Sequence, residues 1–221
     1  LVGSEMCIRD RYLMDPVTHS TAPAQAAVDT MQHYQLLVGS RESRNEIVPL
    51  IAAREGKTIM FMRTKHGVDR QVKKLRRVGI EAQPLHGDKG QGARTRAIEG
   101  FTDGSVPVLV ATDIAARGID ISDVSLVVHI DPPAEHKAYL HRAGRTARAG
   151  TSGTVVSLVM DEQRKEVDQL LRKAGVDAQK IRVTPMSGEL VKITGAQEPH
   201  GRPLPPPGQP QTTKRSRGKR R

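Results

Sequence analysis

The chain has 221 residues, of which 37% are hydrophobic and none is Trp, so it has room for one domain with tails and a core of small aliphatic side chains, which suits buried parallel sheet. Its formal net charge of +11 favours a polyanionic partner. The single Cys7 excludes an internal disulfide, and no Cys or His spacing fits a zinc site. Every apolar run is shorter than the roughly 20 residues that cross a membrane. We therefore expect a cytoplasmic protein without a metal site or membrane contact.

The first eleven residues, LVGSEMCIRDR, do not fit the pattern of the rest of the chain. They lack the apolar core of a signal peptide and lead into no capped element. We expect residues 1–11 to be a cloning or sequencing artefact joined to a truncated gene.

From Gln35 onwards, the apolar residues alternate between the period of a strand and that of a helix, which is typical of βαβ units. A further strand is expected upstream at 32–38, followed by an amphipathic segment at 42–54 in which Pro49 predicts a kink or a late helix start. The remaining strands are predicted at 58–64, 80–85, 106–111, 126–130 and 154–160, and the helices at 68–78, 93–101 and 134–147, with a last helix capped by Asp161 and ended by Gly175. These elements predict one parallel sheet layered by helices.

The pattern dissolves after Gly188, so we predict an ordered domain over 32–193 and a disordered, Pro-rich and basic tail over 194–221. From His200 onwards there are seven basic residues and no acidic one, which leaves 11 − 7 = +4 for the rest of the chain. Such a tail either binds phosphate backbones without reading their sequence or only keeps the chain soluble.

The run HRAGRTARAG at 141–150 carries the first chemical signal. On the predicted helix, His141, Arg145 and Arg148 form one stripe, because they are spaced by four and three residues. Two neighbouring guanidinium groups suit a bound triphosphate. The alternative is a solvated basic face, which is the usual meaning of Arg residues at this spacing.

The run ATDIAARGIDI at 111–121 favours the first interpretation. It follows a predicted strand, and ligands of open parallel sheets bind beyond the carboxyl ends of the strands. Thr112 and Arg117 are suited to a phosphodiester backbone, Gly118 to close approach, and Asp120 to a ribose hydroxyl. Asp113 is interpreted as the N-cap of a short helix.

These two runs resemble motifs V and VI of DEAD-box RNA helicases. Further matches occur in family order: IMF with Thr64 resembles motif IV, and Leu85-His86-Gly87-Asp88 is followed by Gln91-x-x-Arg94 and then by VVHIDPP before YLHR. The matches span residues 58–150, and YLMDP at 12–16 looks like the interdomain linker, which assigns 12–31 to a linker remnant. The resemblance implies an α/β, RecA-like, three-layer fold with an open, mainly parallel sheet flanked by helices.

The resemblance also implies roles for individual residues, in an intact ATP-dependent RNA helicase of which this chain is the C-terminal lobe. Arg145 and Arg148 would act catalytically as arginine fingers, and ATP would be bound by these two residues with Gly118 and Asp120. RNA would be bound by Gly87, Arg94, Thr112 and Arg117, and His141 and Arg142 would couple the two lobes. Ala143 and Ala147 depart from the usual motif VI, but both are small and are expected to preserve the helix.

The half that would hold ATP and Mg²⁺ is not found in these residues. Gly56-Lys57-Thr58 resembles the end of a P-loop, but Ile51 stands where the first Gly is required, and the strand follows rather than precedes it. We therefore expect the Mg²⁺ ligands in a missing N-terminal lobe in cis.

Two alternatives stay open: an isolated chain that binds RNA without catalysis, or the lobe of a related superfamily 2 DNA helicase. A Rossmann domain is rejected because no G-x-G-x-x-G follows a strand. The pattern leaves the oligomeric state and the RNA substrate open.

Overall fold

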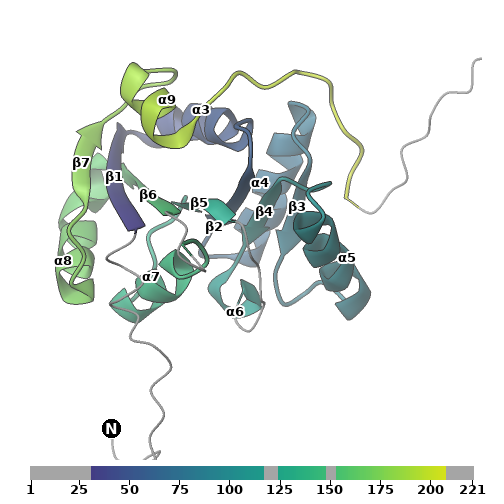
Figure 1. Ribbon diagram of the computed structural model, residues 1–221, viewed down its shortest axis with the longest axis horizontal. Coiled ribbons are helices and arrows are strands. Elements are labelled where there is room, and N and C mark those ends of the chain that lie inside the picture. The colour runs from purple at the N-terminus through teal and green to yellow at the C-terminus, as the bar shows by residue number, and fades with distance from the viewer. Residues whose placement is uncertain (1–30, 117–123, 148–152, 208–221) are drawn as a thin grey trace, which may run out of the picture.

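A computed structural model describes residues 31–116, 124–147 and 153–207 of the chain, which fold around a seven-stranded sheet (Figure 1). The strands run in the order β3-β4-β2-β5-β6-β1-β7, and each of the strand pairs in this part of the chain is parallel. Their bounds are Met31–Gly39 for β1, Lys57–Phe61 for β2, Ala82–Leu85 for β3, Val108–Ala111 for β4, Val124–His129 for β5, Gly153–Met160 for β6 and Gln179–Arg182 for β7.

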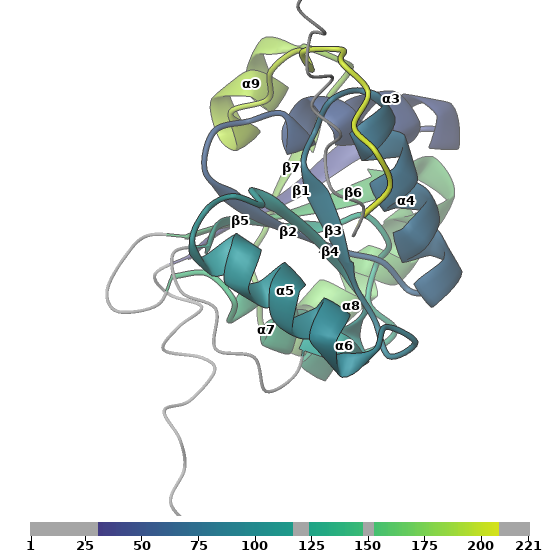
Figure 2. The same ribbon diagram turned by 90° about the vertical axis from the view of Figure 1, so that its right-hand side faces the viewer.

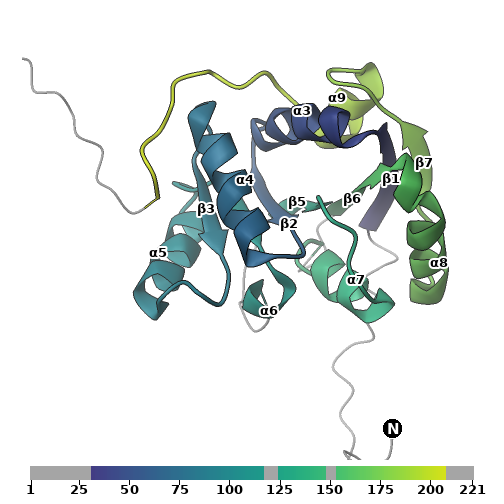
Figure 3. The same cartoon turned by 180° about the vertical axis from the view of Figure 1, so that it is seen from behind.

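Helices cover both faces of this sheet (Figures 1 and 3). One face packs against α3 (Arg41–Ala52), α4 (Lys65–Arg77) and α9 (Gly188–Thr194). The other face packs against α5 (Gln91–Thr102), α6 (Asp113–Ala116), α7 (His136–Ala143) and α8 (Arg164–Ala174). Both cores consist mainly of Val, Ile, Leu and Ala, so the predicted α/β fold of three layers around a parallel sheet is confirmed.

Two helix starts differ from the sequence prediction. Helix α3 already begins at Arg41, capped by the Ser40 hydroxyl, which accepts from Ser43 N at 3.3 Å. It contains Pro49, so a late helix start was wrong. Asp161 does not cap α8 but is the first residue of a 3₁₀ turn, Asp161–Gln163. The end of α8 is as predicted, because Gly175 adopts a left-handed φ of 66°.

The largest local difference is at the end of α7, which stops at Ala143 rather than near Ala147. Gly144 is the C-cap, and Ala147 has a φ of 54°, which no helical residue adopts. The Thr146 hydroxyl donates to the carbonyl oxygen of Val124, and this contact draws the chain down towards β5. The helical stripe predicted for His141, Arg145 and Arg148 is therefore wrong for Arg145.

The described chain also continues beyond residue 193, where the sequence predicts that order ends. Residues 195–207 run as an extended segment from α9 past α4 and towards β3 (Figure 2). Leu204 N donates to the carbonyl oxygen of Arg76 at 2.8 Å, and Gly201 N to that of Val78 at 3.1 Å. The Arg76 side chain returns a bond to the carbonyl oxygen of Pro205 at 2.5 Å. The Pro-rich part is thus held by backbone hydrogen bonds rather than by an apolar core.

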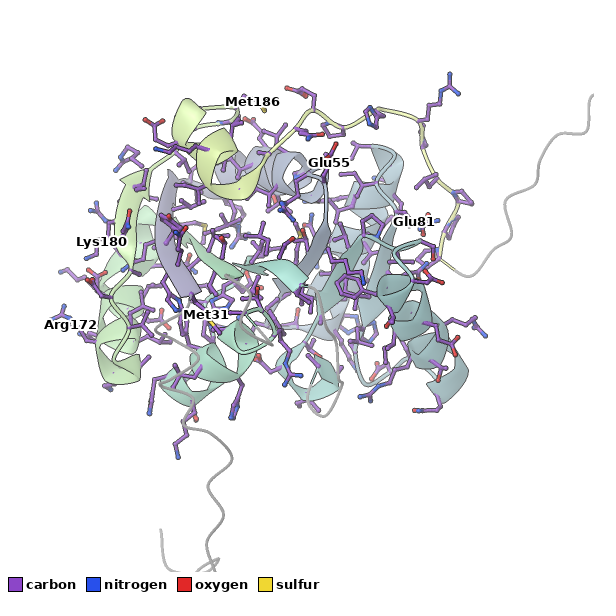
Figure 4. The ribbon with its side chains drawn as sticks, in the orientation of Figure 1. Met31, Glu55, Glu81, Arg172, Lys180 and Met186 are labelled. Carbon is purple, nitrogen blue, oxygen red and sulfur yellow. The ribbon has the colours of Figure 1, made fainter. Side chains whose placement is uncertain are left out.

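Strands β3 and β7 form the two edges of the sheet. Glu81 precedes β3 at one edge, whereas Lys180 on β7 and Arg172 on α8 mark the other (Figure 4). Strand β7 was not predicted, because an edge strand of sequence QKIR carries one apolar residue and no alternation.

Candidate functional site

The carboxyl ends of four neighbouring strands are tied together by backbone hydrogen bonds. Thr112 N donates to the carbonyl oxygen of Leu85 at 3.1 Å, which joins the ends of β4 and β3. Met62 N donates to Ala111 O at 3.0 Å, and Ile130 N to Phe61 O at 3.0 Å. The loops that follow β3, β4, β2 and β5 therefore start side by side, where ligands of open parallel sheets bind.

Three of the four predicted RNA-binding residues lie at this edge. Gly87 is exposed, and a Cβ atom placed on it would meet nothing within 4 Å, so packing does not require a glycine there. Thr112 is half-buried at the end of β4 and accepts from Ala116 N through its carbonyl oxygen. Arg94 donates from Nη2 to Ala115 O at 3.0 Å, which ties α5 to α6. The structure thus brings Gly87, Thr112 and Arg94 to one edge.

Charged pairs flank Gly87. Lys65 Nζ lies 2.6 Å from Asp88 Oδ2, and this hydrogen bond lowers the pKa of the Asp88 carboxyl. The buried His86 places Nε2 at 3.1 Å from Asp69 Oδ1, which Lys89 also approaches at 2.8 Å. These contacts attach the loop after β3 to the first turns of α4, because Lys65 and Asp69 are both residues of that helix.

Arg142 is a buried charge of the site: only 2% of the residue is exposed, and each of its three guanidinium nitrogens donates a hydrogen bond. Its Nε donates to Asp113 Oδ1 at 2.5 Å and its Nη2 to Asp113 Oδ2 at 2.9 Å. Its Nη1 donates to Asp131 O at 2.8 Å, and the group lies 5.1 Å from the Phe61 ring centroid. A bidentate pair of this geometry is among the stronger contacts in proteins. It joins α7 to the start of α6.

Asp131 extends this connection to the ends of β2 and β5. Its Oδ1 accepts from Arg44 Nη1 at 3.2 Å, and its Oδ2 accepts from Arg63 N at 3.1 Å. Arg44 also donates to Ile130 O at 3.1 Å. One carboxylate therefore links α3, the loop after β2 and the loop after β5.

The end of α7 opens onto a small pocket. It is lined by Phe61, Asp113, Ala116, Ala138, His141, Arg142 and Arg145. His141 is exposed and Arg145 is half-buried, and Arg142 beneath them is buried. The pocket thus places the described parts of the two motif runs, 111–116 and 141–147, around one space.

A second buried polar cluster lies next to the Arg142 cluster, one turn earlier on α7, because Tyr139 precedes Arg142 by three residues and the Phe61 ring lies near both Arg142 and His129. The Tyr139 hydroxyl lies 2.8 Å from His33 Nδ1, and the Tyr139 ring packs edge-on against His129 at 4.8 Å between centroids. His129 Nδ1 lies 3.2 Å from the Ser157 hydroxyl. Burial lowers the pKa of His33 to about 4. Burial, and after it the nearby Arg142 charge, lowers the pKa of His129 well below its usual value. Both imidazoles are therefore held neutral.

Four of the predicted site residues lie outside the described residues: Arg117, Gly118, Asp120 and Arg148. Asp113 was predicted to be a helix N-cap, but both of its carboxylate oxygens accept from Arg142. The sequence holds no local signal for this pair, because its partners are 29 residues apart. Within the described ranges no cluster of three or more potential metal ligands occurs, and no helix is long and apolar enough to cross a membrane.

The family model described as "Helicase conserved C-terminal domain" matches residues 42–150. A solved chain of the E. coli DEAD-box protein SrmB, crystallised with regulator of ribonuclease activity A, is 34% identical with a TM-score of 0.66, and the match covers 71% of this chain and 95% of that one. The chain belongs to the DEAD-box helicases. It is their C-terminal helicase domain, as the resemblance of its motifs predicted.

Two further DEAD-box relatives place this C-terminal domain in context. ATP-dependent rRNA helicase RRP3 of Yarrowia lipolytica is 37% identical over 182 residues, which are 82% of this chain and 37% of that protein. A Dbp5 variant of S. cerevisiae, solved bound to RNA and ADP BeF3, is 26% identical with a TM-score of 0.72 over 80% of this chain and 48% of that one. The domain thus spans about a third of the length of the curated relative.

Proposed function

We propose that this domain is the C-terminal lobe of an ATP-dependent RNA helicase, in which it supplies Arg145 and Arg148 as arginine fingers when an N-terminal lobe in cis closes on it. The observation that supports this role is the Arg142–Asp113 pair. Because it joins α7 to the start of α6, it keeps His141 and Arg145 beside α6, which precedes Gly118 and Asp120 in the sequence.

In this proposal each group has a defined task. Asp120 accepts from the ribose hydroxyl of ATP, and Gly118 allows close approach. Bound ATP with Mg²⁺ supplies the transferable phosphoryl group and a charge-neutralising metal, whose protein ligands we expect in the N-terminal lobe. The described lining of the pocket is compatible with the negative charge of a nucleotide. It includes the cationic Arg145, and its carboxylate, Asp113, is paired with Arg142.

The predicted RNA site uses the neighbouring edge of the sheet. Thr112, Arg94 and the Gly87 backbone would hold the phosphodiester backbone, together with Arg117. The RNA-bound Dbp5 structure and the helicase names of the relatives favour this substrate. His141 and Arg142 would couple the lobes, and for Arg142 this coupling acts through Asp113, because the guanidinium itself is buried.

The test of the arginine finger is Arg145→Ala in the full-length helicase that contains this domain. RNA-stimulated ATP turnover should fall by roughly a thousandfold or more, because the charge that develops on the phosphoryl group loses its planar donor. Arg164→Ala, at an exposed position of α8 that belongs to neither motif run, is the matched control and should leave turnover unchanged. Near-normal turnover of Arg145→Ala would refute the assignment.

A second candidate describes the 221-residue chain by itself: an RNA-binding module without ATP turnover. We expect no ATPase activity and weak, salt-sensitive RNA binding that falls when residues 208–221, with their six basic side chains, are removed. The deletion starts at 208 because residues 201–207 are docked on α4. Unchanged binding after the deletion would make the tail a solubilising segment, and preferential binding of single-stranded DNA would favour the DNA-helicase alternative.

A further inference from the structure

A groove between α3 and α4 has no role in the candidate nucleotide and RNA site. We call it the α3–α4 groove; its lining includes Arg41 and Arg44 of α3, Arg70 and Lys74 of α4, and Thr64 and Asp131 at the sheet edge. Lys74 Nζ donates to Asn45 Oδ1 at 3.3 Å, which bridges the two helices along the groove.

The groove carries a strong excess of positive charge. Among the described residues that line it, four are basic and Asp131 is the only acid. Asp131 is already taken by Arg44 and by Arg63 N. Arg41, Arg70 and Lys74 are exposed, and no carboxylate among the lining residues compensates them.

The backbone adds to this charge. Both helices begin beside the groove, α3 after its cap Ser40 and α4 after its cap Thr64, whose hydroxyl accepts from Gly67 N at 3.1 Å. Helix N-termini carry partial positive charge and favour anions. The basic side chains and the two helix dipoles thus both favour binding of an anion in the groove.

The groove is continuous with the predicted RNA edge. Met62 lines it, and Met62 N donates to Ala111 O, the residue directly before Thr112. Lys65, which follows Thr64, pairs with Asp88 beside Gly87. An RNA backbone that is bound at Gly87 and Thr112 can therefore continue directly into the groove.

We propose that the α3–α4 groove binds further backbone phosphates of the same RNA strand that occupies the Gly87–Thr112 edge. This inference rests on the proposed function and extends its RNA site by Arg41, Arg70 and Lys74. An acidic peptide is the weaker fit, because the large apolar side chains of the lining are Ile130, which is 2% exposed, and the half-buried Met62, which leave a partner little apolar surface to pack on.

The experiment compares two oligouridylates, about 6 and about 16 nucleotides long, within the range of single-strand site sizes. Binding to the 221-residue protein is measured by fluorescence anisotropy at several salt concentrations. Arg70→Glu with Lys74→Glu should weaken binding of the long RNA about tenfold and reduce its salt slope by about 1.4, the value for two phosphates on a single strand. The short RNA should lose less, because the edge alone can hold it.

The matched control reverses two charges elsewhere, with Arg164→Glu and Lys165→Glu, both exposed on α8. A neutral pair, Arg70→Gln with Lys74→Gln, reports on the groove even where charge reversal disturbs folding. Equal loss in the groove and α8 variants would overturn the groove while leaving the RNA function intact. No binding of either RNA by the wild-type protein would overturn both. Displacement of bound RNA by an oligoglutamate peptide in the wild type but not in the groove variants would assign the groove to an acidic protein.

Discussion

Helix α7 packs on two buried polar clusters, one of which is charged and the other neutral. Arg142 is ionised and engages Asp113, Asp131 O and the Phe61 ring. In the neighbouring cluster, His33 and His129 are neutral, and each has one ring nitrogen, Nε2, without a partner in the described structure. The first cluster tolerates a full charge because each of the three guanidinium nitrogens donates to an acceptor. The second avoids charge altogether.

The two clusters connect α7 to different parts of the domain. The Arg142 cluster crosses from α7 to α6 and to the loops after β2 and β5, so it fixes the position of the segment that carries Arg145. The histidine cluster reaches β1, β5 and β6 through His33, His129 and Ser157, and it fixes the helix on the sheet. We therefore expect substitutions in the two clusters to change the stability of the domain differently.

The largest effect is expected from Asp113→Ala. It leaves the Arg142 guanidinium buried with one side unpaired, which costs roughly 3 to 5 kcal/mol of folding free energy. For a domain of this size the melting temperature should fall by about 10 °C. Thermal unfolding followed by circular dichroism measures it, and Asp177→Ala, at an exposed carboxylate, is the control.

A double variant separates the charge from the packing. Asp113→Asn with Arg142→Met removes both charges and should be more stable than Asp113→Ala alone, because no buried charge is left unpaired. A melting temperature for Asp113→Ala within a degree or so of the Asp177→Ala control would mean that water reaches Arg142 and that the Arg142 cluster does not hold α7.

The fold could be predicted because its signals are local. The buried strands β2, β4, β5 and β6 are short runs of Val, Leu, Ile and Met, and α4 and α8 place their apolar residues on one side. Edge strand β7 and the docked segment 195–207 could not be predicted, since the buried Ala196 is the only core residue of the described segment 195–207 and most contacts of both are backbone hydrogen bonds to β1, α3 and α4.

The site could be predicted in part, for the same reason. The motif runs indicated Thr112, Arg94 and Arg145, but not that Arg145 lies beyond the helix. Ala and Arg residues at 143–149 favour helix locally, but Gly144 is the C-cap of α7, and a contact from Thr146 to Val124, 22 residues away in sequence, holds the chain that follows. The pairing of Asp113 with Arg142 is equally non-local. The sequence thus predicts which residues gather, and the tertiary contacts decide how they are held.

The histidine cluster should make the stability of the domain depend on pH. The pKa of His33 is lowered from 6.5 to about 4 in the folded domain. Between these two pH values His33 is protonated in the unfolded chain but neutral in the folded domain. Stability is therefore full above pH 6.5 and is lost as the pH falls towards 4. Between pH 7 and pH 5 this one group should remove about 2 kcal/mol at most.

His33→Asn tests this, because its side chain can still pair with the Tyr139 hydroxyl but does not titrate. Urea unfolding at pH 7 and at pH 5 gives the difference for each protein, and subtracting the two differences cancels titrations that the variant leaves intact. His129 remains in both proteins, so some acid sensitivity should persist, because its pKa is lowered too. A pH dependence as steep in His33→Asn as in the wild type would show that His33 protonates within the fold. The contrast between a charged and a neutral support for α7 would then fail, because both clusters would carry charge at pH 5.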